Sequence, residues 1–595
     1  MPRNRSELPL SDTWRLEDIF QTNAEWEQSY ARADASIETM AALEGKLGEL
    51  PALKEVLDLL FSLDLVAGKL YAYARMRRDE DNTRTQYQAL CDRALALCVR
   101  ASTASAFIAP ELLALPMAYL TSAKDHADFS DYRTYLRDII RRKPHTLSAA
   151  EERIAAMAGE LSAAPSNIFD MLTDADMKFP NVTNEDGEAV ALTQSNYIPM
   201  MMSKDRRVRK DAFEALYQTY GSFGASIPAM YAASVKSDIF GARVSKFDSC
   251  LHAALFPDEV PISVYENLIL AVRDHIPSLD RFVRLNAKMN GIDDPQMYDL
   301  YLPVSFGFDL NLEFDDAYAL VCDCLGVLGE DYVQTLRIAR NERWIDAHEN
   351  EGKSSGAYSW GTYDSHPYVL LNHHNDLDGT QTIAHEMGHA MHTFYSNQAQ
   401  PFPTSDYSLF VAEVASTVNE VLVLLELLER HEDPEAQAYL LYNLLDSYRT
   451  TVFRQTMFAE FEKISHAMAE GDVALTGESL GEAYAKLNAE YYPCVSHSPL
   501  IALEWMRIPH FYRAFYVYKY ATGFSAATAI ATKIRAEGQP AVDAYKRFLS
   551  AGSSLPPIEA LKLAGIDMRE KAPVERALSM FDELLAKYES VVSAL

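Results

Sequence analysis

Apolar residues recur at intervals of three and four along most of this chain, and that spacing restricts its fold more than any other feature. Between about residues 24 and 175, alanines and leucines follow this period with charged residues between them; ALKEVLDLLFSLDLVAGKLYAYARMRRD, starting at Ala52, is the clearest case. The pattern returns from 380 to 466 and from 500 to 535. Such a period puts apolar side chains on one face of an α-helix. The sequence therefore predicts a mainly α fold.

Two segments break this period and predict β structure. Residues 179–199 alternate apolar and polar positions around Asp186-Gly187, a pair typical of hairpin turns. Residues 355–374 combine aromatic residues, glycines and an apolar run from Tyr368 to Leu371. We place a domain boundary near 195, so that an N-terminal helical lobe ending in a β-hairpin (1–195) precedes a second domain (196–595).

The charge balance and the apolar runs exclude several classes of partner. Asp and Glu number 85 against 54 Lys and Arg, which gives a formal net charge of −31. Nucleic acids and anionic membrane surfaces are bound through basic faces, so we expect neither as a partner. No run of about 18 apolar residues occurs, so we expect no membrane span. The N-terminus lacks a signal-peptide stretch and the six cysteines form no C-x-x-C pair, so we expect a cytoplasmic protein with reduced thiols. The oligomeric state stays open.

One short motif carries the chemistry: His385-Glu386-Met387-Gly388-His389, the pattern H-E-x-x-H. Its surroundings, TQTIAHEMGHAMHTFY, have the pattern of a helix. Two imidazoles four residues apart on a helix share one face and can bind one zinc ion. Glu386 lies beside them and can reach a water on the metal as general base. The motif predicts one Zn²⁺ per chain.

A catalytic zinc ion needs a third protein ligand, and we expect Glu413. The metzincin pattern is excluded because His392 and Tyr395 stand where it requires glycine and histidine. Glu413 follows His389 by 24 residues in an apolar helix, where a carboxylate is costly to bury unless it binds a cation. An interhelical salt bridge is the alternative. Glu420, on the same face, is expected to orient a ligand histidine. His392 is expected either to do the same or to pack between helices.

IAHEMGHAMH followed by VAEVAST resembles the thimet-oligopeptidase-like zinc peptidases, and most closely their oligoendopeptidase F branch. The segments SGAYSW, PYVLLN and RIPHFYRAFYVYKYATG (507–523) resemble that branch as well, and the resemblance covers about 200–580. It implies a two-lobed helical metallopeptidase with a deep central channel, zinc on the channel floor, and the catalytic zinc peptidase domain in 196–595. We also expect a small β-sheet beside the zinc-binding helix.

The same resemblance points to a histidine and one or more tyrosines of 507–523 as further substrate or transition-state contacts. His510 is the candidate histidine. Tyr512, Tyr516 and Tyr520 recur every fourth residue and are expected to share one helix face, with Tyr512 and Tyr520 as the candidate contacts. Core packing is the alternative for each. The segment Tyr368–Asn372 is expected to pair with an extended peptide by edge addition.

The hypothesis is a zinc-dependent endopeptidase that hydrolyses internal bonds of short oligopeptides, with a water on the metal as nucleophile and Glu386 as general base. Short peptides are then its partners. Two alternatives stay open. One is a non-catalytic helical scaffold or peptide-binding protein that retains the shape of the motif. The other is a different zinc hydrolase with the same ligands, such as a carboxypeptidase.

Overall fold

The structure is a computed structural model that describes residues 3–595. Helices dominate it and strands are few and short, which confirms the mainly α prediction. Packing divides the chain into two compact units, each drawn from three segments far apart in the sequence. Unit 1 holds the chain up to Thr146, Asp309–Leu427 and Ile530–Asp567; unit 2 holds Leu147–Phe308, Leu428–Ala529 and Met568–Leu595. These limits do not include residue 195, and the division into 1–195 and 196–595 stays a prediction.

Unit 1 contains the H-E-x-x-H motif and a sheet. Its helices are α1 (Asn23–Ala41), α2 (Leu50–Asp79), α3 (Thr85–Ser105), α4 (Ile108–Ala114), α5 (Met117–Asp125), α6 (Arg133–Arg142), α14 (Phe314–Cys324), α15 (Glu330–Asn341), α16 (Leu377–Ala399), α17 (Phe402–Ser405), most of α18 (Leu409–Arg430), α23 (Gln539–Leu549) and α24 (Pro557–Leu563).

Unit 2 contains the segment 507–523 and a hairpin. Its helices are α7 (Ala149–Asp170), α8 (Gln194–Met201), α9 (Arg206–Ser222), α10 (Ser226–Val244), α11 (Cys250–Leu255), α12 (Ile262–Asp274), α13 (Ile276–Met289), α19 (Pro434–Tyr448), α20 (Arg454–Glu470), α21 (Gly477–Tyr491), the first part of α22 (Tyr518–Glu537) and α25 (Ala572–Ala594).

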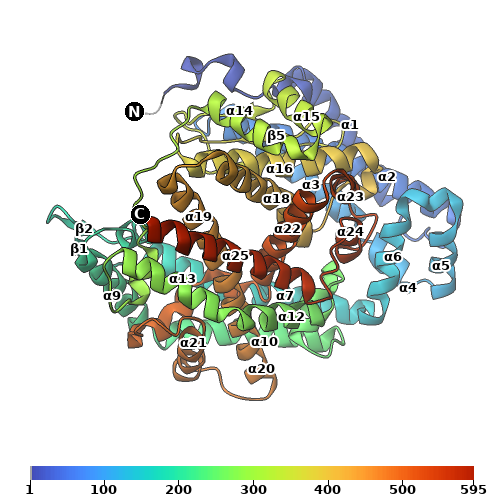
Figure 1. Ribbon diagram of the computed structural model, residues 1–595. Helices are drawn as coiled ribbons and strands as arrows, with labels where there is room; N and C mark the ends of the chain where they lie inside the picture. The colour runs from blue at the N-terminus through green and yellow to red at the C-terminus, as the bar shows by residue number, and fades with distance from the viewer. Residues whose placement is uncertain (1–2) are drawn as a thin grey trace. The chain divides into compact units, whose positions relative to one another are not determined.

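Helix α16 carries the motif and is held on several sides (Figure 1). It begins where the Asp376 side chain caps it by accepting from the Gly379 N–H at 2.7 Å. Its apolar face, which includes Ile383, Met387 and Met391, is fully buried. The helix packs against α14, α23 and the sheet. The motif therefore lies on a helix whose apolar face is part of the buried core.

The sheet of unit 1 has the strand order β3-β5-β4, formed by Ile345–Asp346, Tyr368–Leu370 and Tyr358–Trp360. Strand β5 pairs in parallel with β3 and antiparallel with β4, with Val369 opposite both Ile345 and Ser359. The sheet packs against α16, which confirms the small sheet beside the motif helix. Edge addition of a peptide to 368–370 is wrong, because both sides of β5 are already paired; β3 and β4 are the outer strands.

A buried ion pair fixes the loops around this sheet. The Lys353 side chain is 0% exposed, and its ammonium lies 2.7 Å from Asp346 Oδ1. It also donates to the carbonyls of His348, Leu371 and Asp346, at 2.6, 2.5 and 3.2 Å. Arg5 approaches the same carboxylate at 2.5 Å. Buried charges persist only when paired and hydrogen-bonded in this way. The pair ties the loop before β4 to the segment that leads from β5 into α16.

In unit 2, the expected hairpin is confirmed. Strands β1 (Asn181–Thr183) and β2 (Ala189–Ala191) pair antiparallel, with Val182 opposite Val190. The turn between them contains Gly187 at φ +82°, a left-handed conformation that glycine adopts without strain.

One segment, Thr85–Ala114, is long and apolar enough to cross a membrane by length and composition alone. It is divided between α3 and α4, and α3 packs against α1 and α2. Leu90, Ala94 and Leu97 of α3 are buried in the core there. A core helix passes the same test of length and composition, and the expected absence of a membrane span stays a prediction.

Candidate metal centre

Two imidazoles and one carboxylate converge where α16 passes α18. His385 Nε2 and His389 Nε2 are 3.1 Å apart, as expected for ligands one helical turn apart. Glu413 Oε2, from the N-terminal part of α18, lies 3.4 Å from the first nitrogen and 3.5 Å from the second. These three side chains form a group whose ligand atoms could hold one metal ion.

The spacing of these atoms fits a tetrahedral zinc ion. Ligand atoms about 2.1 Å from zinc in tetrahedral geometry are roughly 3.4 Å from one another. The three separations, 3.1, 3.4 and 3.5 Å, bracket that value. Three protein ligands leave a fourth position for water or substrate. The donor set and its spacing therefore fit a catalytic divalent ion.

Glu413 is half-buried: its side chain is 45% exposed, so the cost of burying its charge is smaller than the apolar sequence around it suggested. Its neighbours Val411, Val414 and Ala415 are buried, and they are why the sequence of this helix is apolar around Glu413. Glu413 lies on a different face, which α18 turns toward the imidazoles. Convergence with two histidines marks this carboxylate as a ligand candidate, and burial does not.

The charges around the triangle favour a cation. Burial of the His385 ring disfavours its charged form, but hydrogen bonds to Glu413 and Glu420 outweigh this and raise the pKa of His385 to about 10. Hydrogen bonds from His385 and His389 hold the pKa of Glu413 well below its usual range. Carboxylates that stabilise protons on imidazoles in this way also stabilise a metal ion that replaces those protons.

Glu420 makes the contact expected of it. Its Oε1 lies 2.5 Å from His385 Nδ1. A carboxylate at that nitrogen holds the proton on Nδ1 and leaves the lone pair of Nε2 directed at the triangle. Its effect on a bound metal stays a prediction.

Glu386 lies beside the triangle and outside it. Its side chain is buried, and its Oε2 has no hydrogen-bond partner among residues 3–595. Burial raises the pKa of Glu386 above its usual range, and the two histidines offset this only in part. A carboxylate with raised basicity and a free oxygen is suited to accept a proton.

His392 packs in the core of unit 1. Its ring stacks on Tyr407 with centroids 3.6 Å apart and lies 5.2 Å from the Phe548 ring. Burial lowers the pKa of His392 to about 3. Its Nδ1 is buried and meets no hydrogen-bond partner in the described part of the chain. Of the two roles left open by the sequence, these contacts fit packing between helices.

In unit 2, the segment 507–523 is not one helix. A 3₁₀ helix, Pro509–Tyr512, is followed by irregular backbone, with Phe515 at φ +57°, and α22 begins only at Tyr518. The expectation that Tyr512, Tyr516 and Tyr520 share a helix face is therefore wrong, because a left-handed residue interrupts the helix between them.

The interruption nevertheless brings three of the candidate rings together. The rings of His510 and Tyr516 are 6.2 Å apart, those of His510 and Tyr520 are 6.0 Å apart, and the two tyrosine rings are 5.5 Å apart. Tyr512 lies elsewhere: its ring stacks on Phe169 of α7 at 4.5 Å, and its buried hydroxyl has no partner among the residues described. The contacts of Tyr512 fit core packing.

Two residues that sequence reasoning missed set the crossing of α16 and α18. A Cβ on Gly388 would lie 2.5 Å from Ser416 Cα, so the two backbones touch at this glycine. Asn419 of α18 is fully buried and donates to the Ala384 carbonyl of α16 at 3.1 Å. A glycine inside a helix often marks a close approach of two backbones. A single Asn in an apolar run indicates a buried side chain that needs a hydrogen-bond partner. Both signals were present in the sequence.

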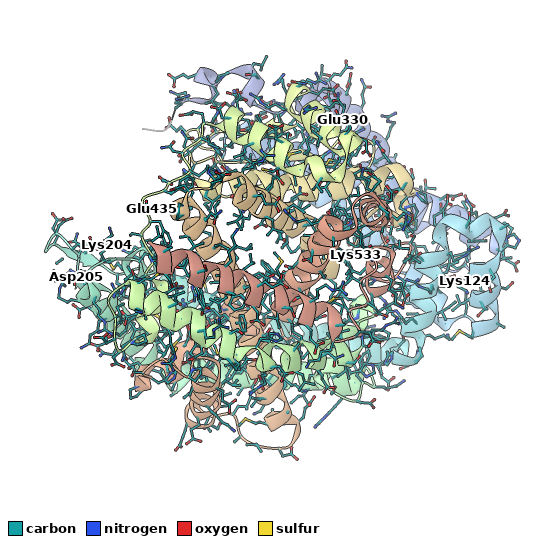
Figure 2. The ribbon with its side chains drawn as sticks, viewed as in Figure 1. Lys124, Lys204, Asp205, Glu330, Glu435 and Lys533 are labelled. Atoms are coloured by element: carbon teal, nitrogen blue, oxygen red, sulfur yellow. The ribbon has the colours of Figure 1, made fainter. Side chains whose placement is uncertain are left out.

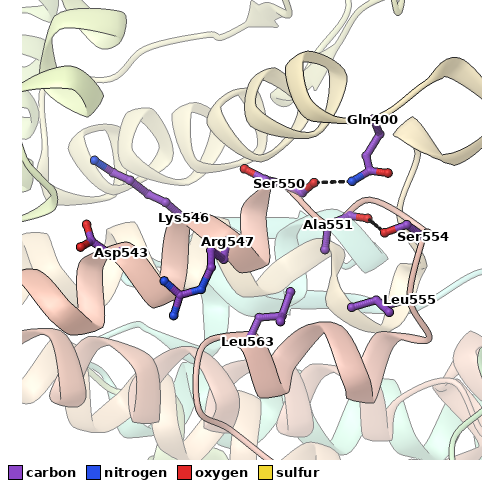
Figure 3. A pocket seen from close by; sticks show the side chains of 9 residues that line it. All are labelled: Gln400, Asp543, Lys546, Arg547, Ser550, Ala551, Ser554, Leu555 and Leu563. Atoms are coloured by element: carbon purple, nitrogen blue, oxygen red, sulfur yellow. Dashed lines mark hydrogen bonds between the residues drawn. The ribbon is translucent and has the colours of Figure 1, made fainter.

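A pocket of about 650 Å³ lies at the C-terminal end of α16 and along α23 (Figure 3). Gln400 Nε2 donates to the Ser550 carbonyl there at 2.8 Å, and Lys546 pairs with Asp331 at 2.6 Å. None of the residues lining it belongs to the triangle of His385, His389 and Glu413.

Comparison with known proteins gives consistent matches. Residues 199–580 match the model of peptidase family M3, and residues 111–179 match that of oligopeptidase F. The chain is 40% identical to oligopeptidase PepF of Bacillus subtilis, over 99% of this chain and 88% of that protein. It is 38% identical to group B oligopeptidase PepB of Streptococcus agalactiae, over 100% and 99%.

Solved structures agree. A putative peptidase from Chlamydophila abortus superposes with a TM-score of 0.93 at 32% identity, covering 99% of this chain and 100% of that one. Oligoendopeptidase-F from Enterococcus faecium superposes with a TM-score of 0.74 at 33% identity, covering 96% and 100%.

Proposed function

This chain belongs to peptidase family M3 as a metalloendopeptidase of the oligoendopeptidase F group, and on that premise we propose that it uses one zinc ion to cut internal bonds of short peptides. The observation that carries the metal is the triangle of His385, His389 and Glu413, with its separations of 3.1 to 3.5 Å. Two imidazoles, one carboxylate and an open fourth position are the usual ligands of catalytic zinc.

A zinc ion bound there would polarise the scissile carbonyl and acidify a water to a pKa near 7. The remaining work falls to the side chains. Glu386 accepts the proton of the attacking water and passes it to the leaving amine. Its burial and unpaired Oε2 support this role. Glu420 keeps the proton of His385 on Nδ1, so that Nε2 stays a ligand.

The tetrahedral oxyanion needs a hydrogen-bond donor, and we assign this role to His510 and Tyr520. The family resemblance supports the assignment, and the two rings lie close to each other and to that of Tyr516. Burial, followed by the charge of Arg513, lowers the pKa of His510, which favours a neutral ring that can donate one hydrogen bond. Tyr512 is the weaker candidate because it stacks on Phe169.

The test compares two glutamates. Glu386→Gln should lower the rate of cleavage of a quenched peptide by about 10²- to 10⁴-fold, since it removes the base. It should leave the zinc content unchanged, because Glu386 is no ligand. Glu413→Ala should lose zinc and activity together. Glu330→Gln is the control. This side chain, labelled in Figure 2, is 83% exposed, and replacing its carboxylate with an amide should change neither the cleavage rate nor the zinc content.

Cleavage by Glu386→Gln at a near wild-type rate would contradict the mechanism. A protein without zinc or cleavage in its wild-type form would instead be the scaffold considered above. Mass spectrometry of the products separates the remaining alternative, because a carboxypeptidase trims residues from one end and an endopeptidase leaves internal cuts.

A further inference from the structure

A small pocket borders the first two turns of α16. It has a volume of about 240 Å³ and lies between Ala357, just before β4, Asn372, just after β5, and the residues Asp378 and Thr382 of α16. Strand β4 is an outer strand of the sheet, so one of its edges is not paired within the sheet. The pocket therefore lies between the segments that precede β4 and follow β5 and the helix that carries the metal ligands.

Two residues that line the pocket, Asp378 and Thr382, lie on the face of α16 that carries the metal ligands. Asp378, Thr382, His385 and His389 follow one another at intervals of four, three and four residues, which places them on one stripe of the helix. Asp378 precedes Glu386 by eight residues, or about 12 Å along the axis at 1.5 Å per residue. An extended peptide rises about 3.3 Å per residue, so the pocket lies about three to four substrate residues from the bond that is cut.

The carboxylate of Asp378 neither caps α16 nor forms an ion pair within residues 3–595. Asp376 already caps α16 through the Gly379 N–H. The helix dipole favours an acid in this turn, but that effect is small and needs no pocket. Among the described residues, two histidines, His373 and His374, line the pocket, but no lysine or arginine does.

The titratable groups around Asp378 are mixed: Asp376 and Glu420 lie near it, and His373 and His374 line the same pocket. Partial burial raises the pKa of Asp378, and the carboxylates of Asp376 and Glu420 raise it further against the opposing effect of His374. A carboxylate whose pKa is raised in this way is stabilised by a positive charge placed beside it. The pocket thus has the size for the end of a basic side chain, and Asp378 is the one carboxylate among the described residues of its lining.

We propose that this pocket binds a lysine or arginine side chain of the substrate peptide, about three to four residues from the cut bond, with Asp378 as its counter-charge. The inference rests on the proposed peptidase function and adds a substrate class to it: basic peptides are cut in preference to acidic ones.

The test measures a ratio within each enzyme. Quenched peptides identical except at one position carry Lys, Gln or Glu there, and the position is moved from two to four residues on either side of the cut bond. The wild-type kcat/KM should favour Lys over Gln by about three- to tenfold at one of these positions, as expected for a partly exposed ion pair, and should disfavour Glu. Asp378→Asn should bring the Lys-to-Gln ratio close to one. Glu330→Gln, which removes an exposed carboxylate of the same unit, should keep the wild-type ratio.

The ratio does not depend on how much of a variant is folded. Equal kcat/KM for the Lys and Gln peptides at every position in the wild type, or an unchanged ratio in Asp378→Asn, overturns this inference while the peptidase function stands. Failure of the wild type to cut any of these peptides overturns the proposed function itself, and the inference with it.

Discussion

Glu420 bonds a nitrogen of His385 that does not face the triangle, and yet it controls what that ring can do. Because its carboxylate holds the Nδ1 proton, the lone pair on Nε2 is available to a metal ion. Glu420→Ala should therefore weaken zinc binding by about 10- to 100-fold. A chelator competition that reads the zinc remaining on the protein measures this effect.

Glu420→Gln is the matched comparison for that variant. Its amide oxygen can still accept from Nδ1, so the loss of affinity should be smaller than in Glu420→Ala. Equal chelator midpoints for the wild type and Glu420→Ala would show that the hydrogen bond does not tune the ligand.

Single residues also show where sequence reasoning succeeds and where it fails. H-E-x-x-H fixes two ligand positions because helix geometry is regular, and the predicted convergence of His385, His389 and Glu413 is present. The tyrosines of 507–523 behave differently. The left-handed Phe515 that separates them donates its N–H to the buried Glu462, 53 positions away in the sequence, at 2.9 Å. No local pattern reveals a turn that a remote side chain holds.

At the level of elements, the site depends on how closely α18 approaches α16. Gly388→Ala would place a methyl group 2.5 Å from Ser416 Cα and 2.7 Å from the Ala415 carbonyl oxygen, so the helices must move apart. We expect a loss of about 1–3 kcal/mol in the free energy of unfolding. Zinc affinity should fall as well, because Glu413 moves with α18. Denaturant unfolding and a zinc titration measure the two effects.

Gly241→Ala in α10 is the control for that substitution. Beyond the backbone of its own helix, no atom lies within 4 Å of the place that a Cβ would take there. The better helix propensity of alanine should therefore leave the protein as stable or add up to about 1 kcal/mol. If Gly388→Ala behaved like this control in both measurements, the close approach would have no role in placing Glu413.

The spacing of apolar residues predicted the helices and the hairpin, but it did not predict which strands pair in the sheet of unit 1. The Asp186-Gly187 turn specifies its own two neighbours, and β1 and β2 pair around it. Strand β5 pairs with β4, which lies in the same predicted β segment, and with β3, a strand of two residues outside it that no pattern indicated. An apolar run indicates that a strand is buried, but not which segments flank it, and that is why the expected free edge at 368–370 was wrong.

For the whole molecule, the metal should stabilise one unit selectively. All three triangle residues belong to unit 1. A metal that binds only the folded state adds about 4 kcal/mol at a concentration 1,000 times its Kd. A chelator should therefore increase hydrogen exchange in α16 and α18, and zinc should restore the protection. Exchange in α20 and α21 of unit 2 should not change. Equal deprotection of all four helices would contradict this selectivity.

The sequence did not reveal which segments of the chain form each unit. Each unit combines three segments that are separated in the sequence, and no change in the composition or period of the sequence marks the ends of these segments. Tertiary contacts decide them, because a helix packs on whichever apolar face lies nearest in space. The expected channel, the cytoplasmic location and the absence of a nucleic-acid partner stay predictions.

The ammonium of Lys353, set among three carbonyl oxygens and Asp346, does what a structural calcium or sodium ion does in many other proteins. It is tethered to the chain, so dialysis cannot wash it out. An enzyme stripped of its catalytic ion would keep this anchor, and its empty centre could be reloaded with cobalt or manganese on an intact scaffold.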